Sequence, residues 1–191
     1  MTPTILADGF AFLEGPRWHQ GALYVSDMHD ETVYRISPDG SREIVCRVEE
    51  RPSGLGWMPN GDMLVVSMMD RSVLRMGDDG ILVPHADLSA IAPKRTNDMI
   101  VDTKGRAYVG NFGFIFDEGE APVPTTLALV LEDGTAQKAA DGLMFPNGMV
   151  ITDNGGTLVV GESYGARLTA FDISPDGQLS NQRVWASLSD G

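Results

Sequence analysis

Cysteine is almost absent from this chain of 191 residues, since Cys46 is its single example. One cysteine excludes both an internal disulfide framework and a cysteine-based zinc cluster. The sequence also lacks any apolar run near the roughly 18 residues that a membrane-spanning helix needs, and no basic-then-apolar leader follows Met1. No Asn-x-Ser/Thr sequon occurs. We therefore expect a cytoplasmic protein that does not associate with membranes.

Basic residues are scarce as well. Lys and Arg total 14 against 27 Asp and Glu, which gives a formal net charge of −13. This balance argues against partners such as nucleic acid or an anionic membrane surface, because both attract positive charge. It is compatible with cation binding. The three histidines, His19, His29 and His85, do not have the spacing of zinc ligands, so a zinc-histidine site is not expected.

No stretch of the chain shows a convincing helical period with capping residues, and the pattern is one of short strands between turns. Four copies of a four-strand pattern begin at Glu14, Ser53, Asn97 and Asn147, at spacings of 39, 44 and 50 residues. Four strands in a repeat of this length are typical of β-propeller blades. We therefore predict an all-β propeller with residues 1–191 in a single domain. Expected strands include Ala22–Ser26, Thr32–Ile36, Met63–Ser67, Ser72–Met76 and Arg167–Asp172.

Two stretches of the sequence echo each other across most of the chain. Ala7–Gly15 and Ala140–Gly148 share Ala, Asp, Gly, Phe and Gly in register. In this register Glu14 and Asn147 occupy the same position, each directly before a glycine. The segment Thr4–Phe10 matches the end of a blade, and we expect it to form an N-terminal strand that latches the last blade of the ring.

Three short motifs, Glu14–Trp18, Arg95–Met99 and Phe145–Met149, together resemble the senescence marker protein/gluconolactonase/luciferin-regenerating family of regucalcin-like lactonases. The resemblance covers essentially the whole chain, blade by blade, and its specificity lies in the order and spacing of the motifs. It implies a six-bladed β-propeller, of which this chain would supply about four blades and the N-terminal latch strand. It also implies hydrolysis of a small-molecule lactone, such as a sugar lactone, at one divalent metal ion in the central tunnel.

The resemblance implies roles for four residues of this sequence. Glu14 and Asn147 correspond to metal ligands of the family. Asn97 corresponds to an asparagine that contacts substrate and water, and Arg95 to a substrate contact. In a ring of six blades, blades one and four face each other, so Glu14 and Asn147 would converge on the tunnel from opposite walls.

The third metal ligand and expected catalytic base of the family is an aspartate in a Pro-Asp-Gly motif. Ser189 stands where that motif has proline, so we interpret Asp190 as part of the preceding loop. The aspartate is then expected beyond Gly191, and the catalytic residue of this chain stays unknown. On this hypothesis the chain is truncated at its C-terminal end and is inactive when expressed alone.

The oxygen ligands implied here suit a hard divalent cation. Carboxylate, amide and hydroxyl oxygens favour Ca²⁺, with Mg²⁺, Mn²⁺ and Zn²⁺ as other candidates. A divalent ion would polarise the lactone carbonyl and activate a water molecule for attack. Ser53 offers a hydroxyl at the equivalent position of the second blade.

Several alternatives stay open at this stage. Glu14 could be a surface carboxylate, and Asn97 and Asn147 could be turn residues that bond only to local backbone. The whole propeller could be a non-catalytic binding or scaffold module with a structural metal, or a related propeller phosphotriesterase. The choice of lactone would depend on loops such as Asn111–Thr126, because long loops in compact folds are often functional. The sequence leaves the oligomeric state open.

Gly161–Gly165 matches the Gly-x-Ser-x-Gly pattern of a nucleophile elbow, with Ser163 at its centre. That motif places its serine on a turn from a strand into a helix. The segment that follows here, Arg167–Asp172, is predicted to be a strand. A serine hydrolase is therefore not expected.

Overall fold

The computed structural model describes residues 3–188, which form four antiparallel sheets of four strands, each built from consecutive strands. Blade one contains β1 (Leu13–His19), β2 (Ala22–Asp27), β3 (Thr32–Ile36) and β4 (Arg42–Arg47). Blade two contains β5 (Pro52–Trp57), β6 (Met63–Ser67), β7 (Ser72–Met76) and β8 (Leu82–Asp87). Blade three contains β9 (Thr96–Val101), β10 (Ala107–Asn111), β11 (Thr125–Val130) and β12 (Ala136–Leu143). Blade four contains β13 (Pro146–Thr152), β14 (Thr157–Glu162), β15 (Arg167–Ile173) and β16 (Leu179–Ser187).

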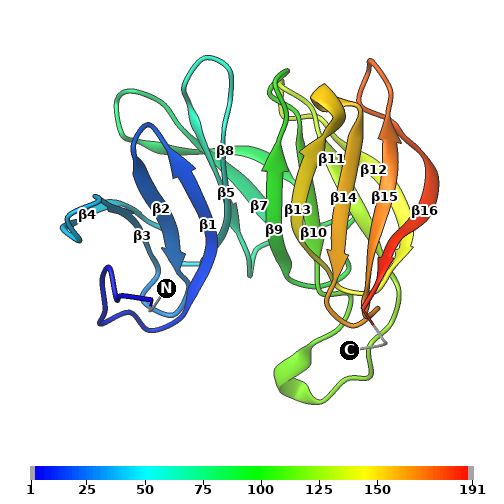
Figure 1. The fold of residues 1–191 in the computed structure, drawn as a ribbon, viewed down its shortest axis with the longest axis horizontal. Helices are drawn as coiled ribbons and strands as arrows, with labels where there is room; N and C mark the ends of the chain where they lie inside the picture. Colours follow the sequence, from blue (N-terminus) through cyan, green and yellow to red (C-terminus); the bar gives the residue numbers. More distant parts are fainter. Residues whose placement is uncertain (1–2, 189–191) are drawn as a thin grey trace.

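This arrangement confirms the predicted all-β propeller blades. The bounds of β3, β6 and β7 coincide with the strands expected from sequence, and two short 3₁₀ turns, η1 (Phe116–Glu118) and η2 (Asp153–Gly155), complete the described elements. Figure 1 shows the four sheets side by side around the innermost strands β1, β5, β9 and β13. No helix within residues 3–188 is long and apolar enough to cross a membrane.

The hydrophobic core lies between neighbouring blades. Leu64 and Val66 of blade two pack against Met99 and Val109 of blade three, and all four are essentially inaccessible to solvent. Separate clusters fill the space between blades one and two and between blades three and four. Each blade therefore buries its apolar faces against its sequence neighbours, as expected for a repeat architecture.

Close approach of the innermost strands depends on glycine. A Cβ atom at Gly54 in β5 would lie 2.4 Å from the backbone nitrogen of Met99 in β9. Because that distance is far below a van der Waals contact, only glycine allows β5 and β9 to pack at this separation. Gly54 thus sets the separation of the innermost strands β5 and β9.

The segment before β1 differs from the predicted latch strand. Residues 3–12 form no strand and lie against the outer part of blade one. Arg42 donates a hydrogen bond of 3.0 Å to the carbonyl oxygen of Asp8. The ring of Phe10 packs edge-on against Tyr34 at 5.5 Å. These contacts hold the segment to blade one and replace the strand pairing that the sequence echo suggested.

Candidate functional site

The four innermost strands share one irregularity near their first residues. Leu13, Pro52, Thr96 and Pro146 each pair with the last residue of the second strand in the same blade. The register of each pair shifts just after this point. A β-bulge re-aims the side chains at the bulge. The residues that follow the four paired positions are therefore structurally equivalent, and they are Glu14, Ser53, Asn97 and Asn147.

Glu14 and Asn147, from blades one and four, line one open cavity of about 420 Å³. Asp98, from blade three, lines the same cavity. Asp98 follows Asn97 where the equivalent positions of the other blades hold Gly15, Gly54 and Gly148. Blade three therefore contributes a carboxylate to the cavity at a position where the other three blades have no side chain.

Glu14 has no cationic partner in this cavity, where Arg167 is already paired with Glu162. Among residues 3–188, none donates a hydrogen bond or forms an ion pair with its half-buried carboxylate. Burial raises the pKa of Glu14 above its ordinary value, and the negative charge of Asp98 raises it further. Asp98 itself is held by Arg17, whose guanidinium lies 2.7 Å from its carboxylate oxygen. The cavity thus contains two carboxylates with a cationic partner, Asp98 and Glu162, and one without, Glu14.

Asn147 uses one side of its amide group. Its nitrogen donates a hydrogen bond of 3.3 Å to Ser163 Oγ, which leaves the amide oxygen available as a ligand. Asn97 is buried, and its amide nitrogen lies 3.5 Å from the carbonyl oxygen of Pro146. The structure therefore brings Glu14 and Asn147 together, while Asn97 packs against the base of β13 and Asp98 takes its place in the cavity lining.

Ser53 is the polar residue at the equivalent position of blade two. Its side chain is 1% exposed, and its Oγ atom has no hydrogen-bond partner among the described residues. A buried hydroxyl without a partner costs free energy unless water or an ion satisfies it. Ser53 is not among the residues that line the Glu14 cavity, although its backbone carbonyl oxygen lies against Gly15.

The side chains at these positions match the chemistry of a hard divalent cation. Glu14 supplies a free carboxylate, Asn147 an amide oxygen and Ser53 a hydroxyl. Within the described part of the chain, no group of three His, Cys, Asp or Glu side chains is placed to hold a metal. A site here therefore depends on amide and hydroxyl oxygens as well as carboxylates. The predictions that concern Ser189, Asp190 and Gly191 lie outside the described residues.

Arg95 lies in a different cavity. Its guanidinium forms two hydrogen bonds with Asp117, of 2.7 and 3.2 Å, and both residues line a space of about 380 Å³. This cavity adjoins the first residues of β1 and β13, because Phe12 and Phe145 line it as well. Arg95 thus lies beside Phe12 and Phe145, each of which stands two positions before Glu14 or Asn147 in the chain.

A set of buried polar side chains, not identified from sequence, holds this end of the blades together. They occupy the last position of each second strand and are Asp27, Ser67, Asn111 and Glu162. Glu162 accepts hydrogen bonds from the Met144 backbone at 2.8 Å and from Arg167 at 2.7 Å, and also from Thr169. Burial raises the pKa of Glu162, but these donors outweigh it and hold the pKa below the ordinary value. The sequence did contain a signal for this set, because a polar residue recurs at the end of the apolar second strand of all four blades.

The elbow-like sequence has the predicted context. Gly161 and Glu162 end β14, and the turn leads into strand β15. Ser163 Oγ accepts its hydrogen bond from Asn147, and none of the residues that line its cavity is a histidine. Ser163 therefore lacks the general base that a serine nucleophile needs.

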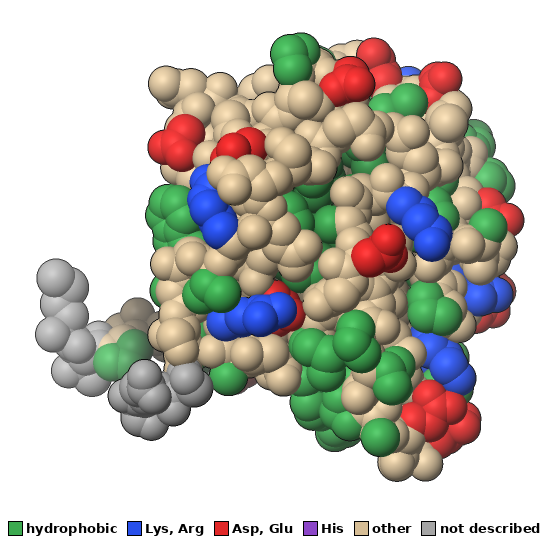
Figure 2. All heavy atoms as spheres, turned by 90° about the vertical axis from the view of Figure 1, so that its right-hand side faces the viewer, with side chains coloured by type: hydrophobic (Ala, Val, Ile, Leu, Met, Phe, Trp, Pro, Cys, Tyr) green, Lys and Arg blue, Asp and Glu red, His purple; other side chains and the backbone are tan. Residues whose placement is uncertain are grey.

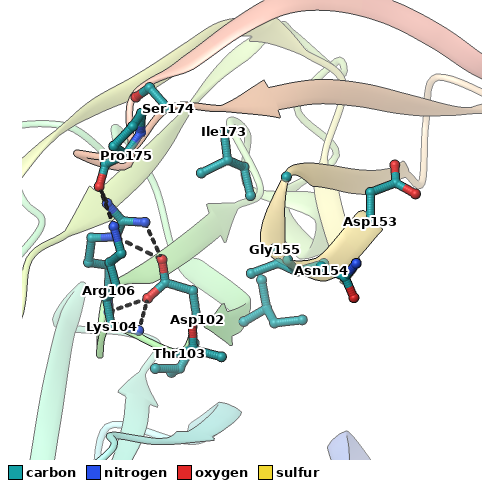
Figure 3. Close-up of a pocket in the computed structure, with 14 residues that line it drawn as sticks. Asp102, Thr103, Lys104, Arg106, Asp153, Asn154, Gly155, Ile173, Ser174 and Pro175 are labelled. Carbon is teal, nitrogen blue, oxygen red and sulfur yellow. Dashed lines mark hydrogen bonds and ion pairs between the residues drawn. The ribbon is translucent and has the colours of Figure 1, made fainter.

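A larger cavity of about 830 Å³ lies at the opposite end of blades three and four (Figure 3). The charged groups of blade three are paired here: Arg106 binds Asp102 at 2.6 Å, and Lys104 donates to the carbonyl oxygen of Pro175 at 2.7 Å. The 3₁₀ turn η2 forms the facing wall. These bonds fasten the turns of two blades to each other, which gives this cavity a structural role.

The fold and the cavity at Glu14 define a β-propeller with an oxygen-rich pocket between its innermost strands. Residues 12–191 match the family described as the SMP-30/Gluconolactonase/LRE-like region, and the chain belongs to that family. The pentonolactonase XacC of Haloferax volcanii is 31% identical over 157 residues, which cover 80% of this chain and 50% of the relative. This chain thus spans about half the length of that curated relative.

Solved structures give the same fold. A gluconolactonase from Xanthomonas campestris superposes with a TM-score of 0.81 at 24% identity, over 97% of this chain and 66% of its own. The calcium-binding protein regucalcin from Agrobacterium tumefaciens superposes with a TM-score of 0.76 at 18% identity, over 92% of this chain and 59% of its own. At these identities the superpositions establish the propeller architecture.

Proposed function

We propose that this protein hydrolyses a small-molecule lactone with the help of a divalent metal ion. The observation that carries the proposal is the half-buried, unpaired Glu14 carboxylate, which shares a cavity with Asn147 from blade four. A carboxylate that is partly desolvated and lacks a cationic partner is destabilised. Binding a cation would relieve this cost, and hydrolysis would exploit the bound ion.

The residues at and near this cavity have separate roles in the hypothesis. Glu14 and Asn147 would hold the metal, which when bound would polarise the lactone carbonyl and lower the pKa of a water molecule. Asp98, fixed by Arg17, adds negative charge that strengthens the attraction of the cavity for a cation. Asn97 and Arg95 are proposed to contact substrate, and the residue that acts as base is not assigned. Cytoplasmic location remains part of the same proposal.

The named relatives support the reaction and the type of metal. The proteins similar to this chain include a pentonolactonase and a gluconolactonase, whose names describe action on lactones. Regucalcin is named a calcium-binding protein. With a donor set of carboxylate, amide and hydroxyl oxygens, we propose Ca²⁺ as the first metal to test, ahead of Mg²⁺, Mn²⁺ and Zn²⁺. A scaffold with a structural metal and a phosphotriesterase are the alternative outcomes.

The test is metal-dependent hydrolysis of gluconolactone by the full-length protein, followed by proton release. Treatment with a chelator should abolish activity, and added Ca²⁺ should restore it. Asn147→Ala should reduce kcat/KM at least about a hundredfold, since a metal ligand is lost. Asn154→Gly is the matched control, because Asn154 lies at the far end of blade four with a φ of 54° that glycine readily adopts.

The outcomes separate the alternatives. Metal binding without hydrolysis of any lactone would favour the scaffold. Hydrolysis of a phosphotriester in place of lactones would favour the phosphotriesterase. Chelator-resistant lactone hydrolysis, unchanged in Asn147→Ala, would refute the metal mechanism.

A further inference from the structure

The cavity that holds Arg95 is built from a second set of equivalent positions. The carbonyl oxygens of Phe12, Arg51, Arg95 and Phe145 accept hydrogen bonds of 2.9 to 3.0 Å from the backbone of Met28, Met68, Phe112 and Ser163, respectively. Each of the four accepting residues stands two positions before Glu14, Ser53, Asn97 or Asn147. We call Phe12, Arg51, Arg95 and Phe145 the rim residues. All four line this cavity, just before the first residues of β1, β5, β9 and β13.

Aromatic rings form much of the wall of this rim cavity. Phe145 packs against Phe112 with ring centroids 4.5 Å apart and against Tyr164 at 5.6 Å. Phe116, from the long loop after β10, adds a ring 6.5 Å from Tyr164. Figure 2 shows hydrophobic side chains gathered at the lower end of the molecule, where this loop hangs in Figure 1.

Part of this apolar wall remains open to solvent. Phe12, Phe116 and Tyr164 are 48%, 62% and 45% exposed, although all three line the cavity. Large aromatic side chains that stay exposed around one concave space are typical of a binding site. A polyhydroxylated sugar alone would leave most of this surface without an apolar partner.

The charges in the rim cavity do not cancel. Arg95 is engaged by both carboxylate oxygens of Asp117. Arg51 also lines the cavity, and it meets the charge of Asp117 only through space, without a hydrogen bond from its guanidinium to any described residue. Two guanidinium groups thus face one carboxylate. The unbonded donors of Arg51 fit an anionic group on a ligand, because guanidinium pairs well with carboxylate.

We propose that the rim cavity binds an aryl or alkyl group, substituted with a carboxylate, of the lactone that is opened at Glu14 and Asn147. The aromatic wall takes the apolar body, and Arg51 takes the carboxylate. Such a substrate would span from the rim cavity to the inner cavity, the one lined by Glu14, Asp98 and Asn147. The two linings meet in the chain, where Ser163 of the inner cavity directly precedes Tyr164 of the rim cavity. This inference rests on the proposed function and names its substrate class.

The test compares three lactones with the full-length protein: gluconolactone, dihydrocoumarin and a ring-carboxylated dihydrocoumarin. The carboxylated aryl lactone should show the highest kcat/KM, followed by dihydrocoumarin and then by gluconolactone. Arg51→Gln should raise KM for the carboxylated lactone about tenfold, since a charge-assisted hydrogen bond is lost, and should leave KM for dihydrocoumarin within about twofold. Tyr164→Ala should raise KM for both aryl lactones.

A binding measurement separates this inference from the proposed function. Calorimetric titration of phenylpropionate, an aryl carboxylate that cannot be hydrolysed, should show binding that weakens in Arg51→Gln. Arg183→Gln is the control, because Arg183 pairs with Asp172 on the outer strands of blade four. Preference for gluconolactone over both aryl lactones would overturn the inference and leave lactone hydrolysis intact. Equal KM for the two aryl lactones in parent and Arg51→Gln would overturn the role of Arg51.

Discussion

The inner cavity and the rim cavity lie next to each other in sequence but differ in character. Carboxylates line the inner cavity, whereas aromatic rings and two arginines line the rim cavity. On β13, Asn147 offers an amide to the inner cavity, and two residues earlier Phe145 presents a ring to the rim. Phe12 and Glu14 repeat this relation at the start of β1. The rim cavity is lined by Phe12, Arg95 and Phe145, and the inner cavity by Glu14, Asp98 and Asn147, two or three positions further along the same segments. A propeller can therefore vary the rim residues without changing the positions that we propose to hold a metal.

Within the inner cavity, two carboxylates differ just as clearly. Glu162 is fully buried and receives hydrogen bonds from three donors. Glu14 is half-buried and receives none from the described residues. A saturated carboxylate stabilises the fold, whereas an unsatisfied one retains its capacity for a ligand. The contrast indicates a structural role for Glu162 and supports the proposal that Glu14 binds a ligand.

The largest effect is expected on removing the charge of Glu162. Glu162→Gln should lower the free energy of unfolding by about 2–3 kcal/mol, because Arg167 and the Met144 amide lose a charged acceptor. Thermal or urea denaturation measures it. Asp172→Asn is the control, since its ion pair is exposed and contributes at most about 1 kcal/mol. Similar losses in both variants would contradict the structural role of Glu162.

The stabilising effect of Glu162 should also depend on pH. The pKa of Glu162 is lowered in the folded protein, so its contribution is complete above the ordinary glutamate pKa. The contribution disappears as the pH falls through the lowered pKa. The difference in stability between the parent and Glu162→Gln should therefore shrink in acid, and a difference that grows there would contradict the assignment.

Asp98→Asn should produce a smaller effect, confined to the inner cavity. Loss of its negative charge should weaken Ca²⁺ binding about tenfold, the size typical of groups that support metal ligands. Asp78→Asn is the matched control, since Asp78 lies exposed in the turn after β7. Calcium titration of the two variants measures the effect. Equal affinities in both would remove Asp98 from the site.

Ser163→Ala should change least. Because Ser163 only accepts a long hydrogen bond from Asn147, lactone turnover should stay within a few-fold of the parent. Steady-state kinetics with gluconolactone decide the point. A thousandfold loss with unchanged thermal stability would revive the serine nucleophile.

Much of this arrangement could be predicted from sequence because the chain repeats. The strand patterns gave the blades, and the echo around Glu14 and Asn147 predicted equivalent positions, which the strand registers now define. The place of Asp98 in the cavity lining was missed. The sequence shows Asp98 where the other blades have glycine, but it does not show that Asn97 is buried while Asp98 lines the cavity. The predicted latch strand Thr4–Phe10 is not formed: the blade that it was expected to complete is not among the four described, and Phe10 packs on Tyr34 of blade one instead.

The rim was only partly visible from sequence, because the echo aligns Phe12 with Phe145 but includes neither Arg51 nor Arg95. Phe12 and Arg51 share neither residue type nor motif, and their equivalence follows from backbone hydrogen bonds. The long loop was expected to affect substrate choice, and the structure places Phe116 and Asp117 in the rim cavity. Its effect on substrate choice stays a prediction, as does the hypothesis of blades beyond the four described.

Calorimetric titration of Ca²⁺ into metal-free full-length protein tests the central claim most directly. The parent should bind one ion, and Glu14→Gln should weaken binding at least tenfold, because it loses the charged ligand of the inner cavity. Glu49→Gln, at an exposed position after β4, should bind Ca²⁺ like the parent. Equal affinity in the parent and in Glu14→Gln would contradict the assignment of Glu14 as a metal ligand.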